Sequence, residues 1–350
     1  MEFNISVVIA TYNGEKYILR QLESIFKQTL SVNEVVICDD NSSDSTVKII
    51  ETFIKKNNLI NWRLYINGEN LGYKNNFKKC IRLVKGDVIF LCDQDDIWKP
   101  DKVEKLIGIF YRYPSCLSVV TNFKLIDSSD QYVINDKNSD NPWFNDRSCL
   151  IYDDLYMTTL SEGLLHCVSP GCTQAFRSEL KEEILSFTVD YPHDYIVSIL
   201  AVIKGGLYYY DKALTLYRKH DNNTSGIPNF VVLRRKGKKI KLLAYYIFYI
   251  IRFCKCCFHK ELIDNYNKVS LVEELDKYTI SCNQMDEYNK WKDYVINRTC
   301  LYDRNKGNKK KYYLKQKRHF GHQFSLEVST GDSIERFALK SMDLIARLKL

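Results

Sequence analysis

The sequence contains few residues that interrupt regular structure, and it lacks an apolar run long enough to cross a bilayer. Its 350 residues include 14 glycines and 6 prolines and show no internal repeat, which argues against low-complexity and repeat proteins. The apolar run at residues 242–251 has ten residues, about half of the roughly 20 that a membrane-spanning helix needs. The first residues carry neither a basic segment nor a small-residue cleavage site, so we expect no secretory signal peptide.

Cysteine is plentiful, but its pattern does not indicate a disulfide framework. The 12 cysteines are scattered along the chain, and Cys38, Cys80 and Cys92 lie within apolar runs. Disulfides belong mainly to secreted proteins, and nothing in the sequence indicates secretion. We therefore expect reduced and mostly buried thiols in a cytoplasmic protein.

Charge divides the chain into two regions. Residues 1–230 hold 25 Lys and Arg against 30 Asp and Glu, whereas residues 231–350 hold 26 against 13. Such a basic excess suits an anionic partner, either phospholipid or nucleic acid. Because the basic run at residues 234–241 borders the apolar run at 242–251, an interfacial helix on a membrane is favoured and no nucleic-acid binding is expected. We expect a catalytic domain at 1–229 and a basic helical region at 230–350, peripheral at the inner face of the plasma membrane.

Strand-like and helical segments alternate in the first 105 residues, which predicts an α/β fold with a mainly parallel, Rossmann-like central sheet flanked by helices. The expected strands in this part are residues 6–10, 34–38, 62–66 and 87–92, and the expected helices are 15–28, 45–56, 75–85 and 100–111. Further along we expect strands at 117–126, 172–176 and 207–218 and helices at 178–187 and 193–204. Residues 127–165 are polar and irregular, and are expected to form an inserted loop.

Three polar clusters follow strands of the predicted parallel sheet, at residues 11–13, 39–41 and 93–96. The carboxyl ends of parallel strands meet at one edge of a sheet, and ligands bind there. The last cluster places Asp93, Asp95 and Asp96 within four positions. Like charges this close repel each other, and a divalent cation that itself holds a phosphate would relieve the repulsion. The pattern therefore suggests metal-assisted chemistry on a diphosphate compound.

Four motifs, taken together in their order and spacing, resemble the family 2 glycosyltransferases, which have the GT-A fold. The motifs are SVVIATYN at residues 6–13, VICDDNSSDST at 36–46, NLG at 70–72 and DQDDIW at 93–98. The resemblance covers residues 4–220, and it implies a nucleotide-binding half at about 1–105 and an acceptor-binding half at about 106–229. The HD pair at 193–194 and YRKH at 217–220 are similar to the rhamnosyltransferase-type subgroup.

The resemblance implies roles for particular residues, with Asp194 as the general base. The positions implied for nucleotide-sugar binding are Thr11, Tyr12, Asn13, Glu15, Asp40, Asn75, Asp93 and Gln94. A Mn²⁺ or Mg²⁺ ion is implied at Asp95, Asp93 and His220, and the acceptor side is implied at Trp98, His166 and His193. Each pattern also has a structural interpretation: a solvated acidic turn, a helix N-cap at Asp194, a surface histidine at 220 and a core tryptophan at 98.

The resemblance implies an inverting hexosyltransferase that uses a nucleotide diphosphate sugar, dTDP-rhamnose or a UDP-hexose. The expected acceptor is a hydroxyl of a lipid-linked oligosaccharide in bacterial surface or capsule polysaccharide synthesis. A nucleotidyltransferase is a second interpretation, but it would carry a Gly-rich, Arg-containing loop after the first strand, where residues 11–15 read TYNGE. A third interpretation is a non-catalytic sugar-nucleotide binder that acts as an assembly partner.

Overall fold

The computed structural model describes residues 2–133, 149–160, 169–220, 223 and 270–304. The chain forms two compact units, which are residues 1–227 with 279–287 and residues 228–278 with 288–350. The residues expected to form the site belong to the first unit. One of them, His166, lies outside the described residues.

Four parallel strands form the first half of the sheet. In spatial order they are β3 (Trp62–Ile66), β2 (Glu34–Asp39), β1 (Ile5–Thr11) and β4 (Val88–Asp93). The central strands read as nearly continuous apolar runs because both of their faces are buried. All four strands point the same way, so the polar clusters that follow β1, β2 and β4 lie at one edge of the sheet.

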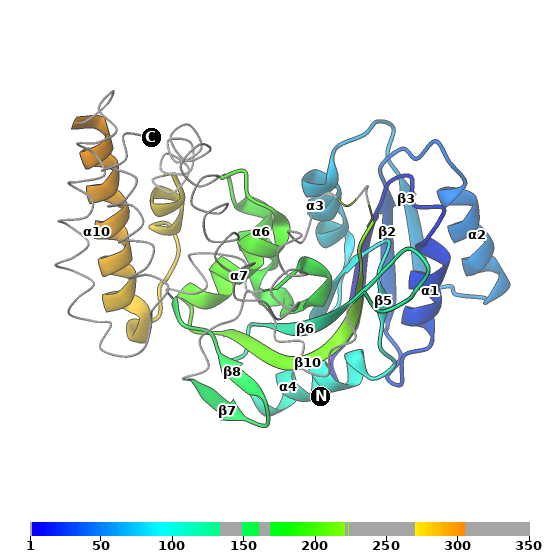
Figure 1. The fold of residues 1–350 in the computed structure, drawn as a ribbon, viewed down its shortest axis with the longest axis horizontal. Helices are drawn as coiled ribbons and strands as arrows, with labels where there is room; N and C mark the ends of the chain where they lie inside the picture. The colour runs from blue at the N-terminus through cyan, green and yellow to red at the C-terminus, as the bar shows by residue number, and fades with distance from the viewer. Residues whose placement is uncertain (1, 134–148, 161–168, 221–222, 224–269, 305–350) are drawn as a thin grey trace, which may run out of the picture. The chain divides into compact units, whose positions relative to one another are not determined.

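Helices cover both faces of this sheet (Figure 1). They are α1 (Ile18–Phe26), α2 (Thr46–Lys56), α3 (Tyr73–Leu83), α4 (Lys102–Arg112), α6 (Lys181–Ser186) and α7 (His193–Ile203). Helices α1, α2 and α4 share one apolar cluster with alternate strand residues, such as Val7 and Ile9 of β1. Helix α3 packs on β1 and β2 and also contacts α6 and α7, so these three form the opposite layer.

The second half of the sheet is mixed, with antiparallel strands whose direction the sequence did not predict. Its strands are β5 (Ile97–Trp98), β6 (Ser118–Ile126), β8 (Leu155–Met157), β9 (Gln174–Arg177) and β10 (Leu207–Arg218). Strand β9 lies between β4 and β6 and is antiparallel to both, and β10 is parallel to β6 but antiparallel to β5 and β8. Hydrophobic patterning identifies buried strands but does not encode their direction, so the sequence could not distinguish these pairings.

Part of the expected loop at 127–165 is a β-hairpin at the end of the sheet. Strand β7 (Leu150–Tyr152) pairs with β8 through a turn at Asp153 and Asp154, whose φ angles are 39° and 64°. Two aspartates with positive φ are typical of a tight hairpin turn. The loop prediction was wrong here because three-residue strands are too short to show a period. Two short 3₁₀ turns, η1 (Gly171–Thr173) and η2 (Ser178–Leu180), flank β9.

In the C-terminal region the structure describes the helix α10 (Cys282–Arg304). Tyr288 and Trp291 of this helix are buried, with ring centroids 6.0 Å apart. Among the described residues, no helix is both long and apolar enough to pass through a membrane. The basic and apolar runs at 234–251, on which the expected membrane contact rests, lie outside the described residues.

Candidate active site

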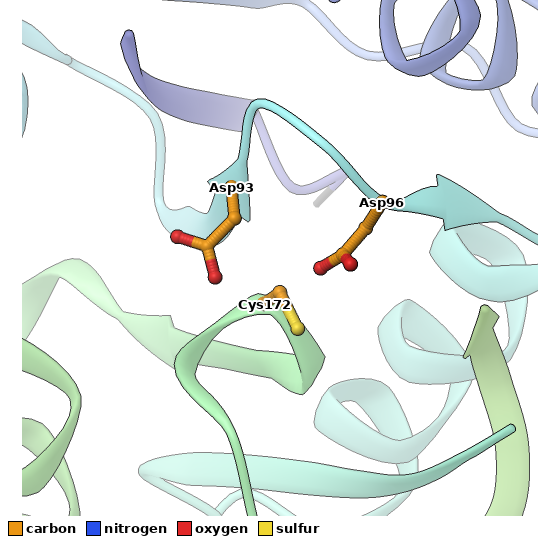
Figure 2. Close-up of side chains that lie close together, drawn as sticks. All are labelled: Asp93, Asp96 and Cys172. Atoms are coloured by element: carbon orange, nitrogen blue, oxygen red, sulfur yellow. The ribbon is translucent and has the colours of Figure 1, made fainter. Parts of the chain in front are cut away.

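The acidic turn between β4 and β5 forms the centre of the site. Asp93 ends β4, and Asp95 and Asp96 follow it at the edge of the sheet. Ligand atoms of Asp93, Asp96 and Cys172 all lie within 4.8 Å of one another. Figure 2 shows the two carboxylates approaching the η1 turn that carries Cys172, so residues 76 and 79 positions apart in the chain meet here.

The carboxylates of this turn strongly perturb one another. Burial raises the pKa of Asp93 well above its ordinary value, and the negative charges of Asp96, Asp95 and Asp194 raise it further. Burial, with the charge of Asp95, raises the pKa of Asp96 to about 7. Burial and the mutual repulsion of these carboxylates thus outweigh the opposite effect of the Lys102 ammonium. Asp194, which is 98 residues away from Asp96 in sequence, is therefore part of the same electrostatic site.

Arg218 at the end of β10 fixes the backbone of the acidic turn. Its Nε donates to the Asp95 carbonyl at 2.6 Å, and its backbone N–H donates to Asp96 Oδ1 at 2.8 Å. The buried guanidinium also lies 4.6 Å from the ring centroid of Tyr17. Arg218 belongs to the YRKH motif, which could have indicated this role, but the sequence interpretation considered only the histidine of that motif.

His220 lies directly beside the acidic turn. Its Nε2 is 2.8 Å from Asp95 Oδ2, and its ring stacks on that of Tyr17 with centroids 5.0 Å apart. The Asn223 amide lies 3.5 Å from the same carboxylate oxygen. The structure therefore brings together Asp95 and His220, two of the three residues that the family resemblance implied as metal ligands.

Asp194 is the second residue of α7 and lies against η1. A Cβ atom added to Gly171 would be only 2.9 Å from Asp194 Cβ and 3.1 Å from its Oδ2. The thiol of the next residue, Cys172, lies within 4.8 Å of the Asp96 carboxylate. The η1 turn is thus the physical link between Asp194 and the acidic turn.

The residues implied for the acceptor side lie in three different environments. His193 is 6% exposed and stacks on Phe77 with centroids 3.7 Å apart, and neither ring nitrogen has a hydrogen-bond partner among the described residues. Burial lowers the pKa of His193 to about 4. Trp98 is 2% exposed and packs against Phe90 in the core. His166 lies outside the described residues.

The loop after β1 is held by Gln94 of the acidic turn. Gln94 Oε1 accepts from Tyr12 N at 2.9 Å, and its Nε2 donates to Tyr12 O at 2.9 Å. Gly14 lies directly beneath this side chain, since a Cβ there would be 2.2 Å from Gln94 Oε1. Both ends of the Gln94 amide are therefore used on protein backbone, whereas the Tyr12 side chain remains 49% exposed.

Asp40 holds the loop that precedes α3. Its buried carboxylate accepts from Asn67 Nδ2 at 2.7 Å and from the backbone N–H groups of Leu71 and Gly72, both at 2.8 Å. A carboxylate offers about four acceptor positions, so one remains for a ligand. In the neighbouring motif, Asn75 is exposed and donates to the Leu71 carbonyl at 3.0 Å.

Asn76, which the sequence interpretation did not select, is the buried asparagine of this motif. Its Nδ2 donates to the Cys38 carbonyl at 2.8 Å, and its Oδ1 accepts from Asn67 at 3.0 Å. The motif NxGxxxN, read from Asn70, ends at residue 76 and was a signal that could have identified it.

Thr11, Asn13 and Glu15 connect the loops after β1 and β2. Thr11 Oγ1 donates to Asp39 Oδ2 at 2.8 Å, which joins the two strand ends. Asn13 Oδ1 accepts from the backbone N–H of Ser43, and Glu15 Oε2 accepts from that of Ser45, both at 2.9 Å. The side chains of Asn13 and Glu15 lie at the surface, while Thr11 is buried.

This sheet order, with paired loops after β1 and β2 and a carboxylate turn after β4, defines a glycosyltransferase of the GT-A type. The chain belongs to glycosyl transferase family 2, whose model matches residues 6–185. An uncharacterized glycosyltransferase of Haemophilus influenzae is 29% identical over 294 residues, which are 79% of this chain and 88% of that protein. The dTDP-rhamnosyl transferase RfbG of Shigella flexneri is 30% identical over 249 residues, or 67% and 78% of the two chains.

A solved structure supports the fold. The crystal structure of S. aureus TarS 1–349 in complex with UDP has a TM-score of 0.54 and 17% identity, and covers 92% of each chain. At this identity the likeness concerns the fold alone. The family and the α/β fold expected from the sequence are thereby confirmed, and the protein is an enzyme that transfers sugars.

Proposed function

We propose that the protein is an inverting, metal-dependent glycosyltransferase that moves a sugar from a nucleotide diphosphate to a hydroxyl group. The observation that carries this proposal is the gathering of Asp93, Asp95, Asp96 and Asp194 around one edge of the sheet. A site rich in carboxylates suits a cation and a diphosphate on one side and a proton acceptor on the other. Three of these carboxylates are provided by the end of β4 and the turn after it, and one by the start of α7, so the two functions rest on different elements.

The proposed donor is dTDP-rhamnose or a UDP-hexose, bound along the carboxyl ends of β1, β2 and β4. The half-exposed Tyr12 ring offers a surface for a nucleotide base, and Asp40 retains an acceptor position for a base N–H group. The name of the Shigella relative, a dTDP-rhamnosyl transferase, and the UDP in the TarS structure are both compatible with a pyrimidine nucleotide. Gln94 is proposed to act through Tyr12, because both ends of its amide are bonded to the Tyr12 backbone.

The residues around the acidic turn fit a small hard cation. Carboxylate oxygens and an imidazole nitrogen are ligands that Mg²⁺ or Mn²⁺ can bind. His220 Nε2 and Asp95 Oδ2 lie 2.8 Å apart, joined by a hydrogen bond that a bound ion would replace. Asp95 and His220, with Asp93, would hold the ion, which when bound would supply positive charge opposite the diphosphate leaving group.

Asp194 is proposed as the general base. The acceptor oxygen forms a bond to the anomeric carbon as the bond from that carbon to the diphosphate oxygen breaks, and the acceptor proton passes to Asp194. Asp194 is well placed for this because it lies in the first turn of α7, where the helix dipole stabilises an anion. Attack from the side opposite the leaving group inverts the anomeric configuration.

The test is a panel of nucleotide sugars with MnCl₂, scored by release of dTDP, UDP or GDP. Asp194→Asn should lower turnover by about 10²–10⁴-fold, the usual contribution of a general base, while donor binding is retained. Asp95→Ala should instead weaken Mn²⁺-dependent binding of the nucleotide. Asp190→Asn is the matched control, because Asp190 also precedes α7 but its side chain is 88% exposed and paired with Lys74. Near-normal turnover by Asp194→Asn would remove it as the base, and binding without turnover in the wild type would support the assembly-partner interpretation.

The acceptor is proposed to be a lipid-linked oligosaccharide, met at the cytoplasmic face of the plasma membrane. The support is the excess of 26 basic over 13 acidic residues in the region 231–350. Replacing Arg234, Arg235 and Lys236 together by glutamine in the full chain should reduce its sedimentation with phosphatidylglycerol vesicles. Equal sedimentation of the variant and the wild type would contradict the membrane proposal without affecting the transfer reaction.

A further inference from the structure

Lys102, the first residue of α4, is a lysine buried entirely beneath the active site. Its Nζ donates to the carbonyl oxygen of Cys172 at 2.6 Å and to Thr215 Oγ1 at 3.0 Å. The same ammonium lies 4.0 Å from the ring centroid of Trp98. Its three N–H donors are thus directed at a carbonyl, a hydroxyl and an aromatic face.

An ammonium in such a position is costly, so its presence needs an explanation. Taking a lysine charge out of water costs several kcal/mol, and an apolar side chain of similar shape is often neutral or better for stability. Burial lowers the pKa of Lys102 to about 8, although the nearby Cys172, Cys92, Asp96 and Asp93 groups act in the opposite direction. Packing alone therefore does not account for a lysine here.

The carbonyl that Lys102 binds belongs to the middle of η1, the turn that links the two carboxylate groups of the site. On one side of this turn the Cys172 thiol lies within 4.8 Å of the Asp93 and Asp96 carboxylates. On the other side, Gly171 lies directly against Asp194. Through Thr215, Lys102 also connects this turn to β10, whose residue 215 pairs with Trp98 of β5. One ammonium therefore joins η1, β10 and the start of α4 at a point between the proposed metal ligands and the proposed base.

We propose that Lys102 is a positioning residue of the transfer reaction, which holds η1 so that Asp194 keeps its place relative to the acidic turn. The proposal rests on the function proposed above for Asp194, although the positioning itself can be measured without turnover. It needs no contact between Lys102 and either substrate, because Lys102 acts through the Cys172 carbonyl.

The decisive variant is Lys102→Met, which keeps the side-chain length and removes the ammonium. We expect a melting temperature no lower than that of the wild type, because a buried charge is removed. Binding of UDP or dTDP with MnCl₂, measured by calorimetry, should keep its stoichiometry and affinity, since the loops after β1 and β2 do not contact Lys102. The kcat for nucleotide release should fall by about tenfold or more, since small displacements of a reacting group are expensive.

A second variant and a control separate positioning from general damage. Lys102→Gln keeps N–H donors on a shorter, uncharged side chain and should lose less kcat than Lys102→Met. It serves as the test if Lys102→Met does not fold. Lys181→Met is the matched control, because Lys181 Nζ also donates to a backbone carbonyl, that of Val84 at 2.7 Å. It should keep the wild-type kcat.

A thiol measurement tests the positioning independently of the reaction. Cys172 and Cys116 are both buried, but only Cys172 lies in η1. If Lys102 holds this turn, Lys102→Met should increase the rate at which N-ethylmaleimide alkylates Cys172 and should not change the rate at Cys116. Mass spectrometry measures both rates. An unchanged rate of Cys172 labelling in Lys102→Met overturns the proposal. A wild-type kcat in this variant also overturns it, and so does a loss of kcat that is matched by an equal loss of nucleotide-binding stoichiometry. A wild type that turns over no donor contradicts the proposed function instead, and the labelling result still decides the role of Lys102.

Discussion

Replacing Gly171 by alanine changes the contact between η1 and the proposed base with a single methyl group. The new Cβ would be 2.9 Å from Asp194 Cβ, which is about 0.6 Å or more inside the separation of roughly 3.5 Å that two carbon atoms prefer. The backbone of Gly171 is not in the left-handed region, so alanine introduces no backbone strain of its own. Either the turn or Asp194 must move by about half an ångström or more.

The expected loss follows from that displacement. A misplacement of about 1 Å can lower turnover about 10²-fold, so we expect kcat to fall by about 10–100-fold, or about 1.4–2.7 kcal/mol of barrier. The KM for the donor should change little, because Gly171 is remote from the loops after β1 and β2. The assay is nucleotide release with MnCl₂ over a range of donor concentrations, with the folded fraction measured by circular dichroism.

Gly108→Ala is the matched control for this experiment. Gly108 lies within α4, and a Cβ added there would meet nothing within 4 Å. Alanine in a helix is favoured over glycine by roughly 0.5–1 kcal/mol, so this variant should be slightly more stable and fully active. A Gly171→Ala enzyme with a kcat close to the wild-type value would refute the reasoning, because it would mean that the position of Asp194 does not limit the reaction.

Two further predictions concern Gln94 and His193. Gln94→Ala should weaken nucleotide binding, measured by calorimetry, because the Tyr12 backbone loses two hydrogen bonds. Gly14→Ala should also weaken binding in the wild type, because its new Cβ clashes with Gln94, but it should cost less in the Gln94→Ala background, where that clash is absent. Strictly additive losses in the double variant would contradict the contact between Gln94 and the loop after β1. Burial lowers the pKa of His193 to about 4, from an ordinary value of 6.5. The neutral ring therefore contributes its full stability above pH 6.5. As the pH falls from 6.5 towards 4, the free energy of unfolding should decrease by up to about 3 kcal/mol. His193→Phe, which keeps the stack on Phe77, should therefore lose less stability than the wild type between pH 7 and pH 5 in urea unfolding, and parallel losses in both proteins would show that His193 does not titrate as described.

Much of the first half of the fold could be predicted because its strands and helices alternate along the chain. Strands β1, β2 and β4 are buried on both faces, and their apolar runs are clear in the sequence, whereas β3 is a partly exposed edge strand. The antiparallel position of β9 and the hairpin of β7 and β8 could not be predicted. Short strands carry no measurable period, and their direction depends on partners that are distant in sequence.

The sequence also located the loops of the site but not the partners of their residues. The family resemblance implied that Asp40 and Gln94 both contact the nucleotide. In the structure the Gln94 amide is used on the Tyr12 backbone, and three of the acceptor positions of Asp40 hold the loop before α3. A residue type at a strand end shows what chemistry it can perform, whereas only its neighbours show what it is already bonded to.

The sequence by itself determined the family, the parallel half of the sheet and the edge at which Asp93, Asp95 and Asp96 gather. The edge could be predicted because alternating strands and helices form a parallel sheet, in which the carboxyl ends of the strands lie together. The tertiary structure alone decided that Cys172 and Gly171 lie between this turn and Asp194, and that Lys102 is buried beneath them. These residues belong to segments that meet only when the sheet is assembled. Their burial and charge arise from that packing, and no local pattern of residues records them.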